Sequence, residues 1–178
     1  MTFEEATNYI THSFLEIFNM AEDYFGKAEK EWSFIGIEFK DDGPYIMYYP
    51  NNKISIVLST GCSNNFQQLF FQLSHETCHL LYPTGKKDAN ILNEGIAVCF
   101  SVVYDRYKFK NSTYAINALT DKYREAYNLV SKLLAIDKDA IKKIRSVYSN
   151  ISNISKDELM SFNFNLDEIE TEKLVSKF

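Results

Sequence analysis

Two histidines four residues apart, with a glutamate beside the first, are the residues of this chain best suited to chemistry. His75, Glu76 and His79 stand in the run His-Glu-Thr-Cys-His. On a helix, residues four apart are offset by only about 40° around the axis, so both imidazoles project from one face. Glu76 lies close enough to reach a metal-bound water without binding the metal itself. This is the H-E-x-x-H pattern of a zinc site with the glutamate as general base.

A catalytic zinc site needs a third protein ligand, because such zinc keeps three and leaves one position for water. The candidate is Glu94, in the run Asn-Glu-Gly at 93–95. Pro83 ends the first helix, and Asp88 is a plausible N-cap for the next, which places Glu94 about two turns inside it. A short loop between antiparallel helices returns Glu94 to the height of the histidines, and Gly95 lets the helices approach closely. The sequence therefore predicts one zinc ion per chain.

The helix that carries Glu94 is apolar, which bears on the role of its carboxylate. Ala97, Val98, Phe100 and Val102 follow Glu94 on this helix. A carboxylate in such surroundings is costly unless it is paired or metal-bound. A metal ligand is one explanation, and a buried lysine or arginine partner is the alternative.

The two motifs together resemble the gluzincin group of zinc metallopeptidases, over residues 32–110. In that group one helix supplies two histidines and a second supplies a glutamate, as the run Asn-Glu-Gly-Ile-Ala at 93–97 would here. The resemblance implies a zincin-like fold and a zinc-dependent peptidase. Glu76 would take a proton from the zinc-bound water and pass it to the leaving amine. Some members carry an aspartate one turn after the glutamate ligand, where this chain has Val98.

Further expectations about the reaction follow from the resemblance. Exopeptidases of this type need extra carboxylates or a glycine-rich segment to hold the substrate amine, and the run 59–62 offers neither, so an endopeptidase is favoured. The strand 54–60 is expected to be the edge that pairs with the substrate backbone, with an ordinary edge strand as the alternative. Tyr123, Tyr127 or Tyr148 could stabilise the oxyanion, although each also fits a plain core position.

A second class of function stays open. With Val98 where some members carry an aspartate that steadies a histidine, and with no assigned oxyanion donor, the chain could be a catalytically weak or inactive zincin-like protein that serves as a protein-interaction module. The enzyme hypothesis predicts that Glu76→Gln abolishes turnover but spares metal binding. The interaction-module hypothesis predicts that the same variant still binds its protein partner. A chance motif in a plain helical protein would bind no stoichiometric zinc.

Length, composition and net charge restrict the kind of protein that this chain can form. At 178 residues with 46% hydrophobic content, the chain is expected to form a single domain, residues 1–178. The net charge of −5 gives no reason to expect nucleic acid or an anionic membrane as partner. Three cysteines are too few for a disulfide framework and indicate small buried residues in a reducing compartment. With no signal pattern and no membrane span, we expect a soluble, cytoplasmic protein acting on a peptide or protein substrate.

Changes in hydrophobic period predict the elements that position these residues. An amphipathic helix runs to Gly26, and His12 falls off its apolar stripe, which indicates a solvated side chain. Three short runs, 32–40, 45–49 and 53–59, are separated by turn signals and predict a small, mostly antiparallel sheet.

The remaining elements are predicted to be helical. Asn64 begins the active-site helix, whose largely apolar circumference indicates a central, buried position. From Asn111 the chain is helical, with a capping box at Ser155. The expected fold is α+β: residues 1–82 hold the N-terminal helix, the sheet and the active-site helix, and residues 83–178 hold the glutamate-ligand helix and the C-terminal helices.

Overall fold

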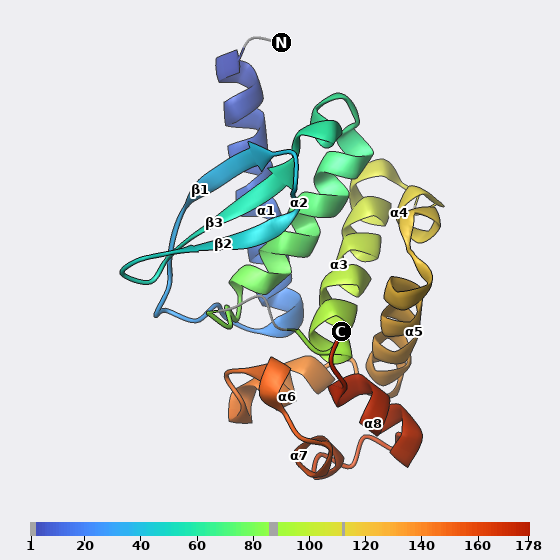
Figure 1. Ribbon diagram of the computed structural model, residues 1–178. Coiled ribbons are helices and arrows are strands. Elements are labelled where there is room, and N and C mark those ends of the chain that lie inside the picture. Colours follow the sequence, from blue (N-terminus) through green and yellow to red (C-terminus); the bar gives the residue numbers. More distant parts are fainter. Residues whose placement is uncertain (1–2, 86–88, 112) are drawn as a thin grey trace.

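Eight α-helices and a three-stranded sheet make up the described part of the chain (Figure 1). This computed structural model describes residues 3–85, 89–111 and 113–178, with side chains from residue 9 onward. The fold is α+β with a helical C-terminal half, as predicted. Among the described residues, no helix has the length and apolar character needed to cross a bilayer. The elements in chain order are α1 (Phe3–Phe25), β1 (Ser33–Lys40), β2 (Tyr45–Tyr49), β3 (Lys53–Ser59), the 3₁₀ turn η1 (Thr60–Asn64), α2 (Phe66–Leu80), α3 (Ile91–Phe109), α4 (Thr113–Ala118), α5 (Asp121–Ile136), α6 (Ala140–Val147), the 3₁₀ turn η2 (Ile151–Asn153), α7 (Lys156–Met160) and α8 (Glu168–Val175).

The sheet is mixed, which corrects the expectation of a mostly antiparallel one. Its strand order is β1-β3-β2, and β3 runs antiparallel to β2 but parallel to β1. The connection from β1 to β2 is therefore not a hairpin, because it carries the chain across the end of β3. Gly43 makes this crossing possible, since a Cβ at that position would lie 2.7 Å from the carbonyl carbon of Leu58.

The strand order also overturns the expectation that residues 54–60 form the substrate-facing edge. β3 is the central strand, and residues 54–58 are all buried. Four of these five residues are apolar, the exception being Ser55, and burial along the whole run is typical of a strand covered on both faces. The edge strand on the side of the predicted site is β2 instead.

The antiparallel helices α2 and α3 lie at the centre of the molecule (Figure 1). Most of α2 is buried, and α3 is buried from Ile91 to Val102. The sheet and α1 pack on one side of this pair, and α5 packs on α3 from the other side. The predicted central, buried position of the helix that carries His75 and His79 is confirmed.

Asparagine side chains cap both central helices. Asn65 caps α2, one residue later than the predicted Asn64, by accepting a hydrogen bond from the third amide of the helix. Asn90 caps α3 in the same way. The predicted cap, Asp88, lies outside the described residues. Because α3 begins at residue 91, Glu94 lies in its first turn and not two turns inside it.

Gly95 has the packing role that its place inside a helix indicates, but its partner is α5 and not α2. A Cβ at Gly95 would lie 2.5 Å from Cγ2 of Val130 and 2.6 Å from the carbonyl oxygen of Ala126. Only glycine allows α3 and α5 to approach this closely. The contact fixes α5 beside the first turn of α3.

The C-terminal helices differ from the predicted pattern at one point. The helical region predicted from Asn111 onward is interrupted early, because α4 ends at Ala118 and α5 begins at Asp121. The capping box at Ser155 is confirmed, with Glu158 as its second member. The chain after α8 returns to the start of α3, where the carbonyl of Ser176 accepts a hydrogen bond from the Ile91 amide.

Candidate metal centre

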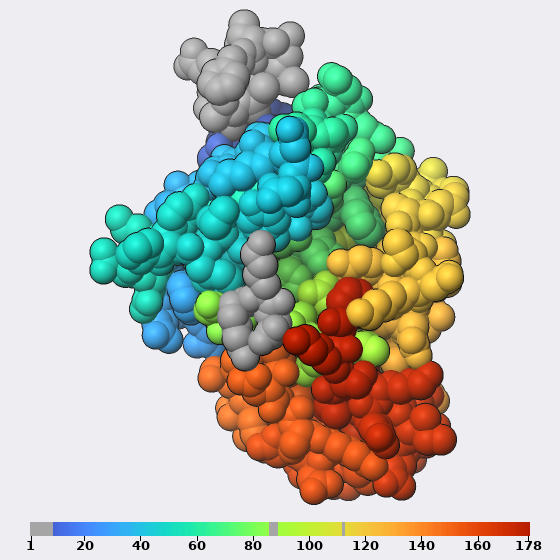
Figure 2. Space-filling model, viewed as in Figure 1, coloured from blue at the N-terminus to red at the C-terminus, as the bar shows by residue number. Residues whose placement is uncertain are grey.

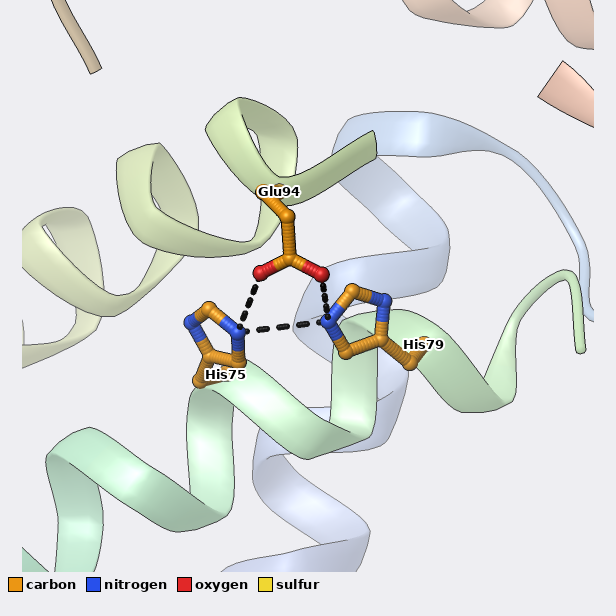
Figure 3. Close-up of side chains that lie close together, drawn as sticks. All are labelled: His75, His79 and Glu94. Atoms are coloured by element: carbon orange, nitrogen blue, oxygen red, sulfur yellow. Dashed lines mark hydrogen bonds and ion pairs between the residues drawn. The ribbon is translucent and has the colours of Figure 1, made fainter. Parts of the chain in front are cut away.

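His75, His79 and Glu94 converge on one point between α2 and α3 (Figure 3). Nε2 of His75 lies 3.2 Å from Oε2 of Glu94 and 3.2 Å from Nε2 of His79. Nε2 of His79 lies 3.5 Å from Oε1 of Glu94. In a tetrahedral site with bonds of about 2.0–2.2 Å to the metal, neighbouring ligand atoms are about 3.3–3.5 Å apart. Each ring nitrogen lies at about this distance from one oxygen of Glu94, His75 from Oε2 and His79 from Oε1, and one donor atom from each residue lies within 4.8 Å of the others. The group could therefore hold a metal ion.

The charges in this group are buried and mutually stabilising. His75 is 7% exposed and Glu94 9%. Burial by itself would raise the pKa of Glu94, but His79 and His75 outweigh it and lower that pKa well below its usual value. Burial likewise opposes a charge on His79, yet Glu94 raises the pKa of this imidazole to about 9. In the described part of the chain, the ion-pair partners of Glu94 are thus histidines and not the lysine or arginine of the alternative reading.

Glu76 lies beside these donors without being one of them. It is 4% exposed and lines the same cavity as the histidines. Burial raises the pKa of Glu76, and the charge of Glu94 adds to this effect. A buried carboxyl group with a raised pKa, at the edge of a metal site, has the properties that a general base requires.

Asn93 supports the site from the first turn of α3. It is buried, and its amide nitrogen donates a hydrogen bond to the hydroxyl of Ser152. Its carbonyl oxygen makes no regular hydrogen bond with a described residue, yet it lies close enough to His79 to help raise the pKa of that ring. Because the partner that orients Asn93 is Ser152, in the distant 3₁₀ turn η2, the sequence alone could not assign a role to Asn93.

Of the three candidate tyrosines, the structure brings Tyr123 to the site. Its ring packs edge-on against the His75 ring, with centroids 5.8 Å apart. Burial, together with the charges of Glu94 and Glu76, raises the pKa of Tyr123, so its hydroxyl stays protonated and can donate a hydrogen bond. The other two candidates, Tyr127 and Tyr148, pack against the hydrophobic core.

The donors line a cavity of about 170 Å³. Its opposite wall comes from β2, through Tyr45, Ile46 and Tyr48. Figure 2 shows this face of the molecule, where parts of α2 and α3 (green) are visible in a hollow between the strands (cyan) and α4 and α5 (yellow). The edge strand thus borders the candidate site.

Two other predictions for reactive side chains agree with the structure. Cys62, Cys78 and Cys99 are free and buried, and burial raises the pKa of each thiol. His12 is exposed on α1. None of these four residues belongs to the candidate metal centre.

No model of a known protein family matches this chain, and no curated protein or solved structure matches it either. The geometry and chemistry of the site therefore carry the functional argument.

Proposed function

We propose that this protein is a zinc-dependent peptidase that cuts within polypeptide chains. The observation that carries the proposal is the convergence of two imidazole nitrogens and the Glu94 carboxylate, together with the buried carboxyl group of Glu76 beside them. Two imidazole nitrogens and one carboxylate oxygen, with a fourth position left open, are the donor set of catalytic zinc. Softer sulfur ligands or an all-oxygen shell would favour other metals.

His75, His79 and Glu94 would hold the ion. A zinc ion in this position would lower the pKa of a coordinated water and polarise the substrate carbonyl. Glu76 takes a proton from the attacking water as the carbon–oxygen bond forms. The same carboxyl group then gives this proton to the amide nitrogen as the carbon–nitrogen bond breaks. A raised pKa suits both steps, because the carboxylate must first bind the proton and then release it.

Two further residues would assist. The hydroxyl of Tyr123 donates a hydrogen bond to the substrate carbonyl oxygen as negative charge develops on it. The side-chain oxygen of Asn93, which lies near His79, would accept a hydrogen bond from this ring and hold it in position. Asn93 would thereby supply the support that an acidic residue at Val98 would otherwise give.

The substrate backbone would lie along β2. This edge strand borders the cavity, and an edge strand can bind an extended peptide through main-chain hydrogen bonds. Strand pairing reads the backbone more than the side chains and needs no free chain end. This is the binding mode that an endopeptidase requires.

The proposal is tested by incubating the zinc-loaded protein with an unfolded protein substrate and mapping the products by mass spectrometry. We expect internal cleavage that a chelator abolishes and added zinc restores. Glu76→Gln should keep its zinc but lose at least about 100-fold in turnover, since it has no base. Full activity in Glu76→Gln would contradict the mechanism. A parent protein with one zinc that cleaves nothing would support the inactive, protein-binding alternative.

A further inference from the structure

A second cavity, of about 300 Å³, opens beside the metal centre on the side of α4 and α5. It shares His75, Glu76 and Tyr123 with the cavity that contains the metal ligands. Any group bound in the second cavity would therefore touch the residues proposed to cut the peptide bond. Its volume is at the lower end of the range for small-molecule pockets, about 300–1,000 Å³.

Much of the wall of this cavity is apolar or aromatic, and Gln68, Gln72 and Thr120 add polar side chains to it. Phe71 lies on α2 one turn before His75, and its ring packs edge-on against Tyr114 of α4, with centroids 6.4 Å apart. Val98, on α3 one turn after Glu94, is fully buried behind them. These residues come from three helices, so the cavity is part of the folded core.

Charge in the cavity is confined to the side that faces the metal. Among the described residues that line it, Glu76 is the only acidic one, and none is a lysine or arginine. The polar side chain of Gln72 is already engaged, because its oxygen accepts a hydrogen bond from the Ser59 amide. An anionic group entering the cavity would lose water and meet no lysine or arginine, and a cationic group could pair only with Glu76, whose carboxyl group the proposed reaction needs. An apolar group, in contrast, would gain from burial.

We propose that this cavity binds a large, uncharged apolar side chain of the substrate, next to the bond that is cut. The inference rests on the proposed peptidase function and names its substrate class: polypeptides with leucine, phenylalanine, methionine or a similar residue beside the cleavage site. Specificity would reside in this cavity, while pairing along β2 would bind the backbone of any sequence.

The test compares otherwise identical peptides that carry leucine, phenylalanine, aspartate or lysine beside the mapped cleavage site. We expect the apolar peptides to be cleaved with kcat/KM at least about tenfold above the charged ones. The same peptides are titrated into zinc-loaded Glu76→Gln protein, so that binding is measured without turnover.

Two variants that add the same negative charge test whether the preference for apolar peptides arises in this cavity. Ala118 is exposed and lines the cavity mouth, whereas its neighbour Asn117 is exposed and does not line it. Ala118→Glu should lower the ratio of leucine to lysine cleavage at least fivefold. Asn117→Glu should leave this ratio unchanged.

Each outcome separates the cavity from the catalytic proposal. Cleavage without an apolar preference, or an equal effect of both variants, would overturn the specificity inference and leave the peptidase standing. Tighter binding of apolar peptides, weakened by Ala118→Glu but without any cleavage, would support the cavity and reject catalysis. No cleavage and no binding preference would overturn both.

Discussion

Two buried carboxyl groups meet the same pair of imidazoles, and their environments drive their pKa values in opposite directions. Burial favours the protonated form of both, but His79 and His75 lower the pKa of Glu94. Burial raises the pKa of Glu76, and the two rings, which also lower this pKa, do not fully offset the effect of burial. Two carboxyl groups whose environments separate their pKa values in this way can take different roles in acid–base chemistry. Glu94 is suited to stay ionised as a ligand, and Glu76 to bind and release a proton.

At the residue scale, Tyr123→Phe tests the proposed oxyanion donor. Removal of the hydroxyl should lower kcat by about 100-fold with little change in KM, because the hydrogen bond strengthens only as charge develops on the substrate oxygen. Steady-state kinetics of the zinc-loaded variant measure this. Tyr127→Phe is the matched control, one turn further along α5 and packed on the core, and it should keep full activity. Equal activity of both variants would remove Tyr123 from the mechanism.

Sequence reasoning succeeded at this scale where the geometry is local. The i, i+4 spacing of His75 and His79 already fixes two donors on one face of one helix. Glu94 needed the further assumption of a short antiparallel connection, which the structure confirms. Tyr123 could not be selected over the other tyrosines, because its place at the site depends on how α5 packs against α3.

At the element scale, the site depends on how closely three helices approach one another. α2 carries two donors, α3 carries the third, and α5 brings Tyr123 to the same cavity. The contact of α3 with α5 is possible only because Gly95 has no side chain. A small change at this contact should therefore affect both stability and the alignment of the site.

Gly95→Ala should destabilise the protein by about 1–3 kcal/mol, because the new methyl group overlaps Val130 and the backbone of α5. This loss would appear even though alanine favours an isolated helix by about 1 kcal/mol. Urea unfolding of the metal-free protein measures the difference. The control is Gly61→Ala, whose Cβ would meet only the Ser59 hydroxyl oxygen, at 3.4 Å, and should have little effect. Unchanged stability in Gly95→Ala would show that α5 can move away freely.

The order of the strands in the sheet could not be predicted from the sequence. The turn at 41–44 has the residues of a hairpin, and nothing local distinguishes a hairpin from a crossing over the end of β3. The run at 54–58, which is apolar except for Ser55, was the available signal for a central strand, whereas the expectation of an edge strand came from the resemblance to gluzincin peptidases. Strand order is decided by which strand the helices cover, so it depends on the whole fold.

At the scale of the whole molecule, Arg145 joins the C-terminal helices to the site-bearing half. Its guanidinium group lies over the ring of Tyr82, 4.9 Å from the centroid. From α6 it donates hydrogen bonds of 2.7–3.0 Å to four backbone carbonyls near the ends of α1 and α2 (Phe25, Gly26, Lys27 and Leu81). One side chain thus gives a charged donor to carbonyls at and just beyond the ends of both helices, close to the turn that carries His79.

Arg145→Ala should lower the free energy of unfolding by about 2–4 kcal/mol, because buried carbonyls lose a charged donor. Urea unfolding in the presence of a chelator measures the protein without any contribution from metal. Lys142→Ala removes an exposed cation of the same helix that pairs weakly with Asp139, and should change stability by less than about 0.5 kcal/mol. A similarly small loss in Arg145→Ala would mean that the two halves are joined by apolar packing alone.

The central claim is that His75, His79 and Glu94 bind one zinc ion. The most direct test is metal content by mass spectrometry, on protein purified without added zinc and again after reconstitution at neutral pH. We expect about one zinc per chain in the parent and in His12→Ala, and much less in His79→Ala and Glu94→Ala. Zinc retained in Glu94→Ala alone would remove Glu94 from the ligand set. No stoichiometric zinc in the reconstituted parent would contradict the account.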